Sequence, residues 1–518
     1  MTELNTKYLK IGKATDLSGR DFIIYRLLEI LPGFLSWATL LTLIILSYLR
    51  PEIVAYFIIA FDVYWFLLVF FLGIHLIASY RAMKANMAID WKEKCTSITQ
   101  SKELGIGWSE IIHLIVLPTY NESFNVIKAT FDAIVADGYP TDKMILVLAI
   151  EERGGEEIKK SAQLIEQEFG SRFKHFLITT HPDGMAGELK GKGANQAWAA
   201  REVQAKIIDP RHYNYDHIIT SVFDIDTIVI PGYFYCLTHK FLTVTRPHRA
   251  SYQPIPIYHN NIWQAPFFAR IAASSNTFWQ MMQQIRAEKL ATYSSHSMSW
   301  KALVDVGFWS TNMVSEDSRI FWHCLSFYKG DYRVEPLYFP VSMDICMDDS
   351  AWKTMKNLYK QQRRWGWGVE NVPYLCFNTI KNWDVLDRKE MIKRILVQIY
   401  GFHSWATNAL IIGVVGWLPV LIGGGSFNST VLANNLPVVT KWLMMFAMGG
   451  MVLSAIISSL LLPKVSGKHK IGKTLVMAIQ WLILPVIIVV FGAVPGLEAQ
   501  TRLMLGKYLG FFVTPKSR

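Results

Sequence analysis

Two aspartates near the middle of the chain have the residue type and spacing of a metal site. Asp224 and Asp226 lie two positions apart at the end of the apolar run HIITSVF. In an extended chain, residues at i and i+2 project from the same face, so both carboxylates can reach one ion. Carboxylate oxygens suit Mg²⁺ or Mn²⁺, which also contact substrate phosphates. The pair therefore predicts a Mg²⁺ or Mn²⁺ site, and the alternative is a solvated turn.

A second acidic pair, Glu316 and Asp317, lies in the sequence SEDSR at residues 315–319. One buried carboxylate beside another can act as a general base. The alternative is a helix start, in which Ser315 caps the helix and the acids stabilise its first turn. The two interpretations are compatible, because a helix start can also carry a catalytic acid.

Lys192 is flanked by glycines in GELKGKGANQAW, residues 187–198, just before a helical pattern. A lysine in a flexible turn at a helix start can approach a phosphate. The alternative is a surface loop without a ligand.

The sequence QQRRWGWG at residues 361–368 combines arginines with tryptophans. Its arginines could bind a pyrophosphate, and a tryptophan face could stack on a sugar. A nucleic-acid patch and an anchor at the membrane interface are the alternatives, because Trp and Arg also favour those surfaces.

Alternating strand and helix patterns surround these residues. Apolar, strand-like runs occur in IIHLIVLPTYNES, in MILVLAIEER, in RFKHFLITTHP and in YDHIITSVF, with helical patterns between the first three. This alternation predicts a mostly parallel sheet with helices on both faces. Ligands of such sheets bind at the carboxyl ends of the strands, where PTYNE and EER lie.

The composition predicts a membrane protein. Hydrophobic residues make up 51% of the 518 residues and charged residues only 18%. Charge-free runs long enough to cross a bilayer occupy residues 31–49, 395–440, 442–462 and 474–494, and residues 53–79 contain a single acid, Asp62. The predicted order is a tail (1–30), a transmembrane hairpin (31–79), a soluble domain (80–394), a second membrane region (395–496) and a tail (497–518).

Basic residues on both sides of the hairpin predict its orientation. They are Lys7, Lys10, Lys13, Arg20 and Arg26 before it, and Arg81, Lys84, Lys92 and Lys94 after it. Positive residues favour the cytoplasmic side, so we expect the soluble domain in the cytoplasm, with the plasma (inner) membrane as the site. The net charge of +11 then needs no nucleic-acid partner. The five cysteines fall in the cytoplasmic part, where free thiols are expected.

The motifs PTYNE, GKGAN, DID, SED and QQRRW occur in the order found in membrane-integrated family 2 glycosyltransferases. The chain resembles the processive branch of that family, which includes cellulose, chitin and hyaluronan synthases. Near the end, FFVTPK at residues 511–516 resembles the F-x-V-T-x-K gating loop of cellulose synthases. The resemblance implies an α/β GT-A domain inserted between transmembrane helices.

The resemblance also implies a role for each matching residue. Nucleotide-sugar binding would involve Thr119, Tyr120, Glu122, Glu151, Lys192, Asp224, Gln361, Arg364, Phe511, Thr514 and Lys516. Asp224 and Asp226 would hold the metal, Asp317 would be the base with Glu316 beside it, and Trp365 would bind the acceptor. The family has an aspartate that contacts uracil where the second strand ends, whereas this chain has Glu151, Glu152 and Arg153.

We therefore expect an inverting, Mg²⁺- or Mn²⁺-dependent enzyme that transfers a sugar from a nucleotide sugar, with UDP as the favoured carrier, to a polysaccharide that is extruded through the membrane. One alternative adds a single sugar to a lipid, and another is a transporter or scaffold with an inactive transferase domain. Five crossings would leave the tail outside. A gating loop must face the cytoplasm, and one way to achieve this is for residues 474–494 to enter the bilayer and return.

Overall fold

A computed structural model describes residues 4–463, 476–477 and 479–514 of the chain. Its centre is an eight-stranded sheet with the order β3-β2-β1-β4-β7-β6-β8-β5. The strands are β1 (Ile112–Thr119), β2 (Met144–Glu151), β3 (His175–His181), β4 (Ile218–Val222), β5 (Ile228–Val229), β6 (Ala250–Tyr258), β7 (Ser297–Ser299) and β8 (Arg333–Met343).

The four strands expected from the sequence form a continuous parallel half of the sheet. Val116 on β1 lies opposite Val147 on β2 and Val222 on β4. Alternate residues enter two cores: Ile115 packs towards α4 (Phe124–Ala136) and α5 (Gly155–Phe169), whereas Val116 packs with residues of α6 (Lys192–Val203). A sheet covered on both faces favours apolar residues on both sides of its strands, as β1 and β2 have at most positions.

The other half of the sheet is mixed. β7 runs antiparallel to β4 and β6, β6 is parallel to β8, and β5 is antiparallel to β8. β6 contains Pro254 and Pro256, and its pairing shifts between Gln253 and Ile255. Proline cannot donate to a strand ladder and weakens the strand pattern, which is why the sequence did not reveal this strand.

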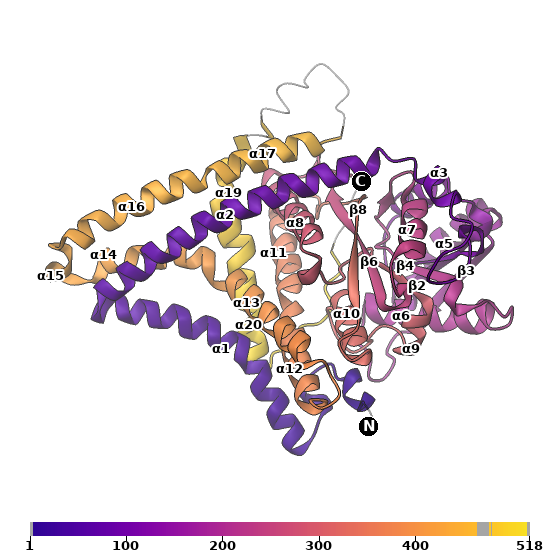
Figure 1. The fold of residues 1–518 in the computed structure, drawn as a ribbon, viewed down its shortest axis with the longest axis horizontal. Coiled ribbons are helices and arrows are strands. Elements are labelled where there is room, and N and C mark those ends of the chain that lie inside the picture. Colours follow the sequence, from indigo (N-terminus) through magenta and orange to yellow (C-terminus); the bar gives the residue numbers. More distant parts are fainter. Residues whose placement is uncertain (1–3, 464–475, 478, 515–518) are drawn as a thin grey trace.

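Five helical segments are long and apolar enough to cross a membrane within the part of the chain that is described. They are α1 (Gly19–Leu49), α2 (Pro51–Met87), α13 (Arg388–Gly413), the pair α16 (Val431–Ala447) and α17 (Gly449–Leu461), and the stretch Gln480–Met504 that ends in α20 (Val494–Met504). α2 and α16 lie side by side and extend away from the sheet (Figure 1).

Two helices connect this region with the sheet. α11 (Ala351–Gly366) packs on α20, and α12 (Asn371–Lys381) packs on α1, α10 (Glu316–Phe327) and α13. Both described ends of the chain also return to the α/β domain. Arg319 donates to the carbonyl of Ile11 at 2.9 Å, and Gln361 donates to the Thr514 hydroxyl at 3.3 Å. The domain is therefore in contact with residues from before the first membrane helix and after the last.

Close packing of α1 on α20 generates a stability prediction. A Cβ on Gly33 would lie 2.8 Å from the Gln500 carbonyl oxygen and 2.8 Å from the Met504 Cβ, whereas a Cβ on Gly401 in α13 would meet nothing within 4 Å. We expect Gly33→Ala to destabilise the fold by about 1–3 kcal/mol through overpacking. Gly401→Ala should be neutral or slightly stabilising, because alanine favours a helix. Thermal unfolding of both variants in detergent measures this, and an unchanged Tm for Gly33→Ala would contradict the packing.

Candidate active site

Lys192 lies at the centre of the acidic cluster. Its Nζ is 2.7 Å from Asp224 Oδ1, 2.9 Å from Asp317 Oδ1 and 3.0 Å from Asp317 Oδ2. The lysine begins α6, Asp224 follows β4 and Asp317 lies in the first turn of α10, so three separate elements meet at one ammonium group. Burial alone would lower the pKa of Lys192, but the charges of the two aspartates outweigh it and hold that pKa above its usual value. Lys192 therefore stays protonated between the predicted metal ligand and the predicted base.

The glycines beside Lys192 permit this convergence. A Cβ on Gly193 would lie 2.9 Å from the Ser310 carbonyl oxygen and 3.1 Å from Glu316 Cβ. Gly191 has a φ of +153°, and its Cβ would lie 2.6 Å from the Phe511 ring. The motif GKG thus lets α10 approach from one side of the lysine and the C-terminal segment from the other.

The two acids at the start of α10 have different surroundings. Glu316 is buried, and its pKa is raised to about 8 by burial and then by the charge of Asp317, against the opposing charges of Lys192 and Arg364. Asp317 instead receives the Lys192 ammonium on both carboxylate oxygens. Ser315 occupies the N-cap position, but its hydroxyl donates to Glu370 at 2.7 Å and makes no cap hydrogen bond.

The predicted metal ligands lie in a turn, and the expected extended geometry is wrong on this point. The Thr227 amide donates to the Asp224 carbonyl at 2.8 Å, and β4 has already ended at Val222. The two carboxylates accordingly differ in exposure: the Asp224 side chain is 24% exposed, and Asp226 is 1% exposed. The pair therefore does not present two equivalent ligands on one strand face.

Two residues that the sequence did not reveal hold Asp226. The Asp344 amide donates to Asp226 Oδ2 at 2.9 Å. Asn260 Nδ2 donates to the Asp226 carbonyl at 3.1 Å and to Asp344 Oδ1 at 2.8 Å. Asp344 follows β8 directly, so an acid at the end of that strand was the available signal.

The carboxylates of Asp224 and Asp226 fit a divalent cation that also binds substrate oxygens. Their oxygen ligands are those that Mg²⁺ and Mn²⁺ accept, and the Lys192 ammonium already lies 2.7 Å from Asp224, so the site attracts positive charge. Among the described residues, no group of three His, Cys, Asp or Glu side chains could hold a metal. An ion held here would complete its coordination with diphosphate oxygens and water.

The ends of β1 and β2 carry the predicted nucleotide residues. Thr119 is buried, and Glu122 folds back to accept the Tyr120 amide at 2.8 Å. Glu151 bonds the guanidinium of Arg153, which lies 4.1 Å from the centre of the Tyr120 ring. Arg153 was noted in the sequence only as a departure from the family, and it is part of this cluster. One strand, β1, separates β2, which ends at Glu151, from β4, which leads to Asp224, so the two strands lie two spacings, about 10 Å, apart.

The helix α11 brings QQRRW to the same region. Gln361 bonds Thr514, the Arg364 guanidinium lies 4.9 Å from the Phe511 ring, and the charge of Arg364 acts on Glu316. Trp365 lies 6.4 Å from Tyr258 at the end of β6, measured between ring centres. Phe511 and Thr514 thus lie against the helix that carries QQRRW, and Lys516 lies outside the described residues.

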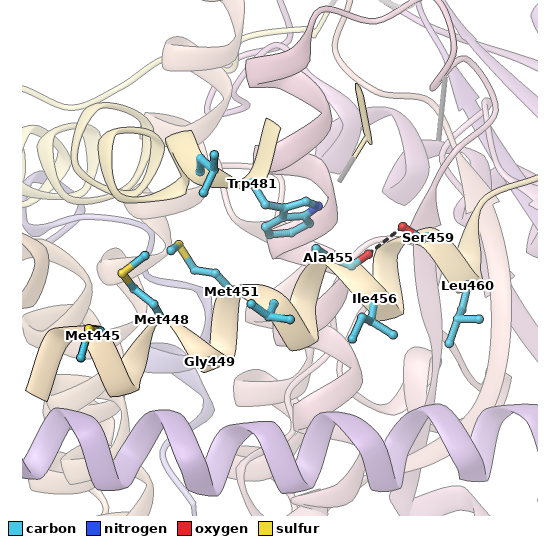
Figure 2. Close-up of a pocket in the computed structure, with 11 residues that line it drawn as sticks. Met445, Met448, Gly449, Met451, Ala455, Ile456, Ser459, Leu460 and Trp481 are labelled. Carbon is cyan, nitrogen blue, oxygen red and sulfur yellow. Dashed lines mark hydrogen bonds between the residues drawn. The ribbon is translucent and has the colours of Figure 1, made fainter. Parts of the chain in front are cut away.

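An apolar cavity of about 600 Å³ lies elsewhere, between α17, the end of α16 and Trp481 (Figure 2). Methionines and aliphatic side chains line it, and its Ser459 hydroxyl donates to the Ala455 carbonyl of its own helix at 2.8 Å. No lining residue is ionisable, so this cavity takes no part in the acidic cluster.

The chain belongs to glycosyl transferase family group 2. The family model matches residues 219–494, more than half of the chain, including the DID, SED and QQRRW motifs. No curated protein sequence matches the chain.

Similar solved structures are the mannosyltransferase PcManGT from Pyrobaculum calidifontis in complex with GDP-Man and Mn²⁺, and residues 1–349 of TarS from S. aureus. The first has a TM-score of 0.43 at 14% identity and covers 77% of this chain and 98% of its own. The second has a TM-score of 0.35 at 9% identity and covers 68% of this chain and 91% of its own.

The family assignment confirms the predicted resemblance at the level of family 2 glycosyltransferases. The predicted fold class, an α/β GT-A domain inserted between apolar helices, is confirmed as well, with a sheet that is mixed in its second half. All five cysteines are free and buried, as expected. The roles of individual site residues stay predictions.

The raised pKa of Glu316 predicts a pH-dependent stability. Between about pH 4.5 and about pH 8, folded protein keeps a proton on Glu316 that the unfolded chain has lost. Raising the pH through this window should therefore lower the free energy of unfolding. Glu316→Gln is neutral at every pH and should show a shallower decline of Tm over the same window. Equal slopes in the wild-type protein and the variant would show that Glu316 is already ionised.

Proposed function

We propose that this family 2 glycosyltransferase is an inverting enzyme that transfers a sugar from a nucleotide sugar to the hydroxyl of a growing polysaccharide. The observation that carries the proposal is the contact of one lysine, Lys192, whose side chain is 12% exposed, with both Asp224 and Asp317. It joins a carboxylate suited to a metal–diphosphate complex to a carboxylate suited to proton transfer. Both lie at the carboxyl edge of the parallel strands, where ligands of such sheets bind.

In the proposed reaction, Asp317 takes the proton of the acceptor hydroxyl, and the resulting oxygen attacks the anomeric carbon of the donor. The bond from that carbon to the diphosphate breaks in the same step, so its configuration inverts. Mg²⁺ or Mn²⁺, held by Asp224 and Asp226, would neutralise charge on the departing diphosphate. Lys192 and Arg364 are cations of this chain placed to do the same, and Lys192 must leave Asp317 before that carboxylate can act as a base.

The nucleotide would lie along the ends of β4, β1 and β2. Two strand spacings, about 10 Å, suit the span from a diphosphate at Asp224 to a base near Glu151 and Tyr120. A UDP-sugar is the donor that the family resemblance favours, with Glu151 in place of the family's aspartate. Thr119 and Glu122 would shape the same loop.

The C-terminal segment would close over the loaded site. Phe511 packs on Gly191 and Arg364, and Thr514 bonds Gln361, so the segment bridges the lysine loop and the QQRRW helix. Closing such a segment excludes water and so favours transfer over hydrolysis. Lys516 would add a further cation for the diphosphate.

The contacts of both chain ends with the α/β domain support a cytoplasmic tail. Two crossings by α1 and α2 bring the chain back to the side where it began. Of the three apolar segments after the domain, an even number must then cross fully. We propose that one of these three segments does not cross fully, in the plasma (inner) membrane with the domain in the cytoplasm.

Replacing the proposed base tests the reaction directly. Asp317→Asn cannot accept the acceptor proton, so transfer should fall by roughly 10²–10⁴-fold while donor binding persists. Asp132→Asn, an exposed change on α4, is the matched control and should keep wild-type turnover. Transfer from several radiolabelled nucleotide sugars and nucleotide binding by calorimetry measure both properties. Near-normal turnover of Asp317→Asn would overturn the assignment of the base.

Product length tests processivity. A tryptophan face holds a sugar by apolar, weakly directional contact, so the chain can advance by one unit after each addition. We expect long polymers at low conversion from the wild-type enzyme, and shorter polymers from Trp365→Ala with donor affinity nearly unchanged. Sizing the products by gel filtration measures this.

A lipid carrying one sugar as the wild-type product would instead support the single-transfer alternative. No turnover of any nucleotide sugar, with or without acceptor, would support the inactive scaffold or transporter.

A further inference from the structure

A cleft of about 360 Å³ lies where the α/β domain meets the membrane helices. One wall is the α11 side chains of Met355, Lys356, Tyr359, Lys360 and Arg363, and the other is Val490 and Phe491. The second wall belongs to the apolar stretch Gln480–Met504. Three cations thus border a cleft with an apolar floor.

The cleft and the active site use different faces of α11. At about 100° per residue, Lys356, Lys360 and Arg363 lie within about 60° of one another, and Gln361 and Trp365 lie about 100–180° away from them. Arg364 lies between the two groups, about 40° from Lys360. The contacts agree with this division. Arg363 bonds Glu498 of α20 at 2.7 Å, whereas Arg364 lies at the Phe511 ring. The two adjacent arginines of QQRRW, about 100° apart on the helix, therefore contact different partners.

The charge in the cleft is not balanced by its acid. Glu498 accepts the Arg363 guanidinium, the Arg502 guanidinium at 2.7 Å and the Tyr359 hydroxyl at 2.7 Å, so its oxygens are already shared. Within the described part of the chain, no carboxylate pairs with Lys356 or Lys360. Their ammonium groups lie over the Trp352 and Phe512 rings, each 5.1 Å from the ring centre.

Two further observations indicate the nature of the ligand. The Nε of Arg363 is buried without a hydrogen-bond partner among the described atoms, so a donor is left over inside the cluster. The apolar wall continues into side chains that face outward from the membrane stretch, with Val486 57% and Ile488 44% exposed. Trp352 at the start of α11 is 60% exposed, which is typical of a residue at the membrane interface.

We propose that this cleft binds an anionic phospholipid. The phosphate would meet Lys356 and Lys360, and an acyl chain would lie along Val490 and Phe491. Basic pockets beside membrane helices on the cytoplasmic side bind lipid head groups in this way. A free phosphate or a nucleotide would leave the apolar wall unused, so the lipid is the ligand that matches both walls.

A lipid in this cleft would contact both α11, which carries Gln361, Arg364 and Trp365, and the stretch that ends in α20. It would hold α11 against α20 and so act as a positioning ligand for the site. This second part rests on the proposed function, because only an active transferase can be stimulated. The binding site itself does not depend on any activity.

Lipid binding is tested with the full chain in neutral detergent. Micelles with phosphatidylcholine alone are compared with micelles in which roughly a third of the lipid is phosphatidylglycerol. We expect phosphatidylglycerol to raise the Tm of the wild-type protein. The double variant Lys356→Glu/Lys360→Glu should lose this rise, since each lysine removed lowers affinity about fivefold. If charge reversal prevents folding, the double variant Lys356→Gln/Lys360→Gln is used in its place and should also lose the rise in Tm.

The matched control is Lys389→Glu/Lys393→Glu at the start of α13, which makes the same charge change beside the membrane but outside the cleft. It should keep the full rise in Tm. An equal loss in both double variants, or no rise in any protein, would overturn the site. A rise of the same size with inorganic phosphate alone would also overturn it, since the ligand would then be a free anion.

A donor-hydrolysis measurement in the same micelles separates the two parts of the proposal. Stimulation by phosphatidylglycerol in the wild-type protein but not in Lys356→Glu/Lys360→Glu supports the positioning role. A rise in Tm without stimulation of an active enzyme refutes that role and leaves the binding site. A rise in Tm with no hydrolysis of any nucleotide sugar refutes the proposed function instead.

Discussion

The arrangement of the site depends on one largely enclosed ammonium group, that of Lys192. Lys192 forms ion pairs with Asp224 and Asp317, which come from separate elements. Without the lysine, the two carboxylates would repel each other in a partly desolvated cluster. A buried charge is tolerated only when it is paired and hydrogen-bonded, and this lysine has carboxylate oxygens on two sides. The same constraint explains the glycines around it, since any Cβ at 191 or 193 would push Phe511 or α10 away from the ammonium. The glycine-flanked loop, the start of α10 and the C-terminal segment therefore all pack closely around the Lys192 ammonium.

The helix that carries Glu316 and Asp317 is itself anchored by a buried arginine one turn later. Arg319 is fully buried and donates to Asn371 at 2.7 Å, to the Ile11 carbonyl at 2.9 Å and to the Glu370 carbonyl at 3.3 Å. Its plane also stacks 3.8 Å from the centre of the Tyr374 ring. A planar guanidinium with several donors can join three chain segments where a lysine could not. The position of the acidic pair is therefore coupled to the segment before the first membrane helix and to α12.

The sequence could predict those parts of the fold and of the candidate site that depend on local interactions. The strands β1 and β2 are almost continuous apolar runs, and β3 and β4 begin with apolar or aromatic residues, so both the strands and the polar residues at their ends were predictable. The membrane segments were predictable because hydrocarbon excludes charge over a fixed length. The proline-containing strand β6 and the side-chain partners Asn260, Asp344 and Arg153 were not. Their contacts are with residues that only the fold brings close, and such contacts leave no periodic pattern in the sequence.

The stretch QQRRWGWG shows why a basic, aromatic motif left several interpretations open. An amphipathic helix at a membrane boundary needs cations and aromatic rings on the side that meets the interface, and a diphosphate site needs cations as well. α11 lies between the sheet and α20, so it must satisfy both requirements with one short sequence. Because consecutive residues of a helix point in different directions, Arg363 bonds Glu498 whereas Arg364 lies at the Phe511 ring. Arg363, which contacts the apolar helix α20, and Arg364, a predicted site residue, are then neighbours on one helix, so α11 joins α20 to the predicted acceptor residue Trp365.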